Sequence, residues 1–149
     1  MKIRFAIARS GAVTETAWNP RGGAAIELAP EALGVLIRGL ADIATNAWKA
    51  REKMLDEKGE PREETKRSYR HVDAVLRRLQ DMEIRIVSHD HEIFDYGMPL
   101  KVIATQPTPG LARDTIIETL KPTVYWRQEM LQMGEVIVGT PQDSMQGET

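Results

Sequence analysis

The chain has 149 residues, the size of one domain, and 28% of them are charged while only 5% are aromatic. The 20 basic and 22 acidic side chains leave a net charge of -2, so bulk charge does not favour binding to nucleic acid or to a membrane surface. The absence of cysteine excludes disulfides, thiolate metal sites and cysteine nucleophiles. Arg4 and Arg9 interrupt the apolar N-terminal stretch and no apolar run could span a bilayer, so we expect a cytoplasmic protein that binds neither nucleic acid nor membrane.

Residues 1–30 are predicted to form an extended N-terminal arm. Ile3, Phe5 and Ile7 alternate with the residues between them, which is the period of a half-buried strand. Asn19-Pro20 and the glycine pair that follows then break the chain.

A first amphipathic helix is predicted to follow the arm. Pro30 and Glu31 are typical of a first helical turn, where a missing N–H costs no hydrogen bond and an acidic side chain meets the positive end of the helix dipole. Apolar residues then recur every three or four positions, with Trp48 expected in the core, until about Leu55.

Residues 31–83 as a whole are predicted to be a helical hairpin. The charged segment 56–64 contains a glycine and a proline and indicates a turn, and a second apolar stripe follows over about 62–82. Because two narrow stripes enclose little core, we expect two copies of the chain to form a four-helix bundle. The residues predicted to lie at this dimer interface are Leu33, Ile37, Leu40, Ala44, Ala47, Val72, Leu76 and Leu79.

After Met82 the pattern changes to short strands. Strand-like segments, separated by turns, lie at 84–87, 100–105, 114–120, 123–126 and 134–140, and a turn-rich loop is expected at 106–110. The predicted fold class is therefore α+β, with a small antiparallel sheet or a compact β-domain at 84–140 after the hairpin. The tail at 141–149 has nothing to bury and is predicted to be disordered.

One segment of the β-domain, SHDHEIFD at 88–95, is rich in side chains that can bind metal. On a strand, its two histidines would share a face, as in some metal-dependent hydrolases, but no second cluster completes the ligand set. We therefore favour a structural turn in which Phe94 is buried and both histidines are solvated, and we predict no metal and no cofactor. The possible ligands considered are His89, Asp90, His91, Glu92 and Asp95.

The remaining motif search favours an interaction protein over an enzyme. The sequence contains no phosphate-binding GxxxxGK[ST] loop and no GxGxxG after a predicted strand. None of its serines lies in a nucleophile elbow.

The order of motifs resembles the GrpE family, the nucleotide exchange factors that assist DnaK-type chaperones in protein folding and the stress response. A helical pair precedes the junction IRIVSHDHEIFDYGMPLKVIA, which is followed without a gap by TIIETLKPTVYWRQEMLQMGEVIVG. The resemblance covers residues 33–139. The residues that fit the family pattern are Glu92, Phe94, Asp95, Val102, Thr115, Ile116, Ile117, Leu131, Val136 and Val138.

This resemblance implies a homodimer that binds the nucleotide-binding domain of a DnaK-type chaperone and promotes ADP release without covalent chemistry. Glu129 and Gln132 fall where the family has arginines, which implies a partner with a basic or neutral patch. The alternatives are a dimeric scaffold or regulator without exchange activity, and a metal-dependent hydrolase using His89 and His91. The partner-binding residues that the resemblance implies are Met98, Pro99, Arg127, Glu129, Gln132 and Met133.

Overall fold

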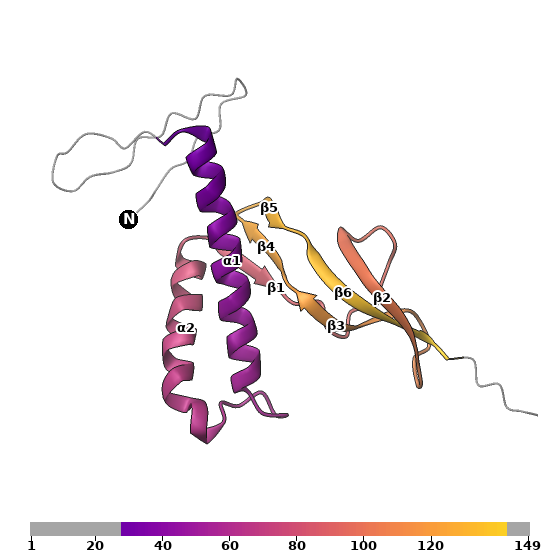
Figure 1. Ribbon diagram of the computed structural model, residues 1–149. Helices are drawn as coiled ribbons and strands as arrows, with labels where there is room; N and C mark the ends of the chain where they lie inside the picture. Colours follow the sequence, from indigo (N-terminus) through magenta and orange to yellow (C-terminus); the bar gives the residue numbers. More distant parts are fainter. Residues whose placement is uncertain (1–27, 143–149) are drawn as a thin grey trace, which may run out of the picture. The chain divides into compact units, whose positions relative to one another are not determined.

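The computed structural model describes residues 28–142, so the predicted arm and tail lie almost wholly outside the described residues. The chain divides into two units, Met1–Leu40 and Ala41–Thr149, and the described part of the first unit is mostly helix. The second unit contains the remaining elements, and the described chain is α+β, as predicted (Figure 1). Its elements are α1 (Pro30–Met54), the 3₁₀ turn η1 (Glu63–Thr65), α2 (Lys66–Asp81), β1 (Ile84–Val87), β2 (Leu100–Thr108), β3 (Thr115–Lys121), β4 (Thr123–Trp126), β5 (Glu129–Gln132) and β6 (Gly134–Pro141).

A tight turn joins the end of α1 to the start of α2. The N–H of Arg62 and the hydroxyl of Thr65 both donate to the Met54 carbonyl, at 2.9 and 3.2 Å, so they satisfy a carbonyl that the helix end leaves free. From this turn α2 runs in the opposite direction to the last part of α1 (Figure 1). Both predicted helices are confirmed, and the 3₁₀ turn delays the start of α2 to Lys66.

The strands form two three-stranded sheets, in the orders β1-β4-β5 and β2-β6-β3. The predicted antiparallel arrangement is wrong for β2 and β6, which pair in parallel. β6 lies between β2 and β3 and is antiparallel to β3, so the chain passes through β3, β4 and β5 before it returns beside β2 in the same direction. β2 also continues to Thr108, through the loop predicted at 106–110. Pro107 is compatible with this edge strand because its missing N–H costs nothing on the open side.

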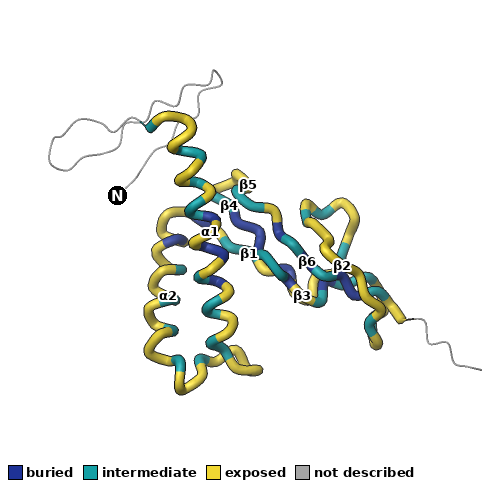
Figure 2. Tube along the Cα trace, in the orientation of Figure 1, coloured by how far each residue is buried: buried dark blue, intermediate teal, exposed yellow. Residues whose placement is uncertain are grey.

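The core of the β2-β6-β3 sheet lies on one face. Ile116, Val136 and Val138 are at most 1% exposed, and Phe94, Met98 and Leu100 pack against them. Figure 2 shows buried residues along β3, β4 and β6, whereas β2 is exposed over almost its whole length. This one-sided core fixes the position of the segment 88–99, which connects β1 to β2.

Candidate partner-binding site

Residues 91–94 of the connecting segment lie along the edge of β3 and extend that sheet. The His91 N–H donates to the Ile116 carbonyl and the Ile116 N–H donates to the Glu92 carbonyl, both at 2.8 Å. The Phe94 N–H donates to the Asp114 carbonyl at 2.9 Å. These bonds hold the backbone of the junction on the sheet, so its side chains have defined positions.

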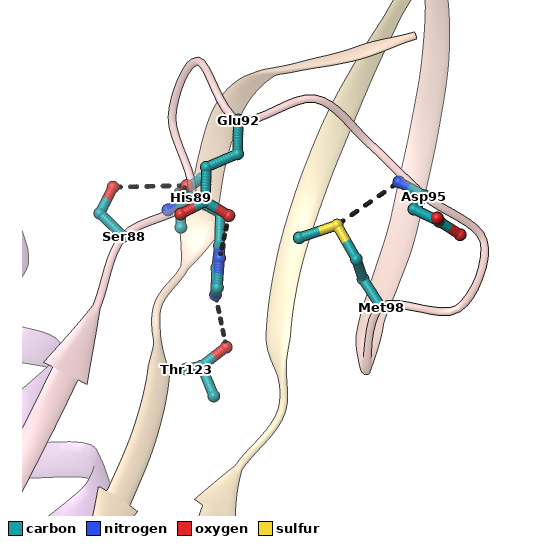
Figure 3. Close-up of polar contacts among 7 residues, drawn as sticks. Ser88, His89, Glu92, Asp95, Met98 and Thr123 are labelled. Carbon is teal, nitrogen blue, oxygen red and sulfur yellow. Dashed lines mark hydrogen bonds and ion pairs between the residues drawn. The ribbon is translucent and has the colours of Figure 1, made fainter.

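His89 is buried at the start of this segment and both of its ring nitrogens have partners. Its Nδ1 lies 3.0 Å from Glu92 Oε2, and its Nε2 lies 2.8 Å from the hydroxyl of Thr123 (Figure 3). Its backbone N–H donates to Thr119 Oγ1 at 3.0 Å. The prediction that His89 is solvated is therefore wrong, because its imidazole bridges β4 and a carboxylate and the residue is only 8% exposed.

His91 is exposed, as predicted, and it does not share a face with His89. The two residues lie on non-strand backbone, and His91 has a φ of 68°, which is turn geometry. Within residues 28–142, no three or more His, Cys, Asp or Glu side chains come together in a way that could hold a metal ion. His71 is also exposed, on α2. The strand geometry on which the hydrolase alternative depends is therefore not formed.

A closed turn at residues 95–98 follows the junction. The Met98 N–H donates to the Asp95 carbonyl at 2.9 Å, and the Gly97 N–H donates to Asp95 Oδ1 at 2.8 Å. The Asp95 N–H lies 3.4 Å from the Met98 sulfur (Figure 3). Met98 is half-buried and packs on the Ile116 core, so it supports the turn from inside.

The exposed apolar or aromatic side chains here are Tyr96 and, just after the turn, Pro99. Tyr96 is 88% exposed, and its ring centroid lies 5.2 Å from that of half-buried Phe94 in an edge-to-face arrangement. The sequence analysis did not select Tyr96. The Asp-Tyr-Gly sequence could have indicated it, since aspartate and glycine are typical turn residues on either side of an exposed position.

Arg127 occupies the tip of the β4–β5 hairpin and is tied to the end of α2. Its backbone N–H donates to the Glu83 carbonyl at 3.0 Å, and its Nε lies 2.7 Å from Glu83 Oε2. Its guanidinium also lies 4.8 Å from the centre of the Trp126 ring. Arg127 therefore has a role within the chain, in addition to any contact with a partner.

The other three predicted partner residues on this hairpin differ in their surroundings. Gln132 is half-buried, and its side-chain amide donates to the Thr45 hydroxyl and to the Pro122 carbonyl, each at 2.8 Å. Glu129 is exposed, and Met133 is 49% exposed. Pro99, Glu129 and Met133 are thus exposed, whereas Met98 and Gln132 are half-buried and make contacts within the chain.

The residues predicted for the dimer interface divide in a similar way. Ala44 and Leu79 are 0% and 4% exposed within one chain, so they belong to its own core. The remaining six are half-buried: Leu33, Ile37 and Leu40 in the first unit, and Ala47, Val72 and Leu76 in the second.

The part of α1 in the second unit carries a further apolar stripe, on a different face of the helix from its buried residues. Ile43 is 52% exposed, and Ala47, Ala50 and Met54 follow it at spacings of four, three and four residues. These spacings place the four side chains along one face of the helix. The stripe is narrow and uncharged, as expected of a surface that packs against another helix.

No protein-family model matches this chain, and no curated protein matches it in sequence. None of the helices in the described part of the chain is long and apolar enough to cross a bilayer.

Proposed function

We propose that the chain is a GrpE-like co-chaperone that binds the nucleotide-binding domain of a DnaK-type chaperone and promotes ADP release. The mechanism is non-covalent. A co-chaperone that binds the open form of the nucleotide cleft more tightly than the closed form shifts the population toward the open form, from which ADP dissociates. Such a mechanism requires a rigid complementary surface and no reacting group.

The observation that carries this proposal is the order of the elements. A helical pair is followed by a small two-sheet unit, in the order that the resemblance implies, and the junction motif lies where the helices give way to strands. The backbone bonds of residues 91–94 and the turn at 95–98 make this junction rigid. Pro99, Glu129 and Met133 are exposed, as a partner-binding surface requires.

The proposal includes a homodimer. The stripe of exposed Ile43 and half-buried Ala47, Ala50 and Met54 supports it, because partly exposed apolar side chains are stabilised when a second copy covers them. The proposed interface also includes Val72 and Leu76, which are half-buried on α2.

Release of a fluorescent ADP analogue from the DnaK-type chaperone encoded near this chain's gene tests the proposal. We expect the full-length chain to accelerate release in a concentration-dependent manner, in stopped-flow mixing with excess unlabelled nucleotide. Glu57→Arg, an exposed change in the helix–helix turn, is the control and should accelerate release as the wild type does. Release that is unchanged by a saturating concentration of the chain would contradict the proposed function.

A further inference from the structure

The turn at residues 95–98 presents a tyrosine that is exposed and yet held in place. Tyr96 is 88% exposed, while its neighbours Asp95 and Met98 close the turn through three hydrogen bonds to backbone N–H groups. Phe94 supports the tyrosine ring from one side at 5.2 Å. An aromatic side chain on such an ordered turn loses little conformational entropy when a partner covers it, so more of its contact energy is available for binding.

The segment that carries Tyr96 is acidic in sequence. Asp90, Glu92 and Asp95 are exposed, and the sequence has no lysine or arginine between Val87 and Leu100. Carboxylates around an apolar contact favour a partner that presents basic side chains and disfavour one that presents acidic side chains. Ile93, which is 59% exposed, adds apolar surface to the same segment.

We infer that Tyr96 anchors a protein partner whose docking surface is an apolar pocket bordered by lysine or arginine side chains. Tyrosine is among the residues that dominate interface energies when they fill a pocket, whereas the charges at the rim govern the rate of association and the choice of partner. The inference deepens the proposed function because it locates the anchor on the junction turn. It rests on the proposed function for the identity of the partner.

Affinity measurements with the purified DnaK-type chaperone test this anchor. We expect Tyr96→Ala to weaken binding of the full-length chain by about tenfold or more, because a filled pocket loses its ring. Tyr96→Phe retains the ring and should stay within about threefold of wild type. Met82→Ala, at another exposed apolar side chain, is the matched control and should bind as the wild type does.

Two charge-reversal variants test whether basic side chains border the partner's pocket. Asp90→Lys should weaken binding and make it less sensitive to salt, while Glu57→Lys, an equal charge change in the helix–helix turn, should do neither. If wild type binds the chaperone and Tyr96→Ala binds equally well, the anchor is wrong and the co-chaperone proposal stands.

If wild type does not bind the chaperone, the co-chaperone proposal is wrong, and photo-crosslinking decides the anchor. A photoreactive phenylalanine at position 96 is compared in the native cell with one at position 82. If a specific adduct forms at position 96, the crosslinked protein is identified and purified. A loss of about tenfold in its affinity for the Tyr96→Ala variant would show that Tyr96 anchors this different partner. No adduct at position 96, or no loss of affinity, overturns it.

Discussion

His89 joins the junction to β3 and β4, whose bonded residues Thr119 and Thr123 are 30 and 34 residues away in sequence. Its imidazole links the Glu92 carboxylate to the Thr123 hydroxyl, and its backbone bonds the Thr119 hydroxyl. Thr119 and Thr123 are themselves buried, at 6% and 1% exposure. Because buried polar groups cost free energy unless they are hydrogen-bonded, this network favours one position of the junction over others.

Replacing His89 should therefore destabilise the fold more than replacing its neighbour. We expect His89→Ala to lower the free energy of unfolding by about 1 to 3 kcal/mol, since the Thr123 hydroxyl loses its partner in a buried position. His91→Ala, at an exposed turn residue, should change it by less than about 0.5 kcal/mol. Urea denaturation measures both, and equal effects of the two changes would contradict the structural role of His89.

The sequence was informative about single residues only where a local pattern decided their burial. Trp48 on the apolar stripe of α1 is buried, as predicted. His89 was misjudged because its partner Thr123 is 34 residues away, and nothing in the local sequence indicates that hydroxyl. Gln132 was selected because the resemblance places an arginine there, and its hydrogen bond to Thr45, 87 residues away, is likewise not indicated by the local sequence.

At the scale of the elements, periodicity predicted the helices and most strands but not their pairing. The two helices and β1, β3, β4 and β6 lie within a few residues of their predicted positions. β5 was missed because its sequence, EMLQ, has no β-branched residue and is short. The parallel pairing of β2 with β6 depends on contacts distant in sequence, which a local pattern does not contain.

The turn between the helices should make stability depend on pH. Asp56 Oδ1 accepts the N–H groups of Glu60 and Lys58, which lower the pKa of the carboxyl below its ordinary value, and the charge of Arg62 lowers it further. A carboxyl whose pKa is lower in the folded state contributes stability above its unfolded pKa. That contribution is lost as the pH falls through the folded pKa.

We therefore expect the difference in stability between wild type and Asp56→Asn to be present near pH 7 and to shrink as the pH falls below about 4. Urea denaturation across this range measures it. Glu57→Gln, at the neighbouring exposed carboxylate, is the control. A difference that stays constant from about pH 7 to about pH 3 would show that the Asp56 charge is not involved.

Two substitutions should separate the dimer interface from the core of one chain. Ile43→Asp changes a side chain that is half-exposed in one chain, so we expect a folded monomer, because a carboxylate disfavours an apolar seam between copies. Leu79→Asp places a carboxylate at a residue that is only 4% exposed, so this variant should unfold. Sedimentation velocity and circular dichroism measure the two results, and a wild type that sediments as a monomer at micromolar concentration would contradict the dimer.

At the scale of the whole molecule, the prediction of an interaction protein depends on the lack of phosphate-binding and nucleophile motifs in the sequence. In the structure, the same junction that resembles the family motif is fixed by backbone bonds and by the His89 network. Rigidity at that position matters for the proposed mechanism, because only a surface that keeps its shape can favour one state of a partner over another.

The choice of partner should depend on the charge of β5. Glu129 is exposed where the resemblance places an arginine, so like charges would oppose an acidic chaperone surface and favour a basic or neutral one. We expect the chain to accelerate ADP release from a chaperone encoded near its own gene and not from the housekeeping chaperone. Glu129→Arg should weaken the first pair a few-fold, since an exposed ion pair contributes about 0.2 to 1 kcal/mol, while Glu57→Arg should leave it unchanged. Equal acceleration of both chaperones, unaffected by Glu129→Arg, would show that this surface does not select the partner.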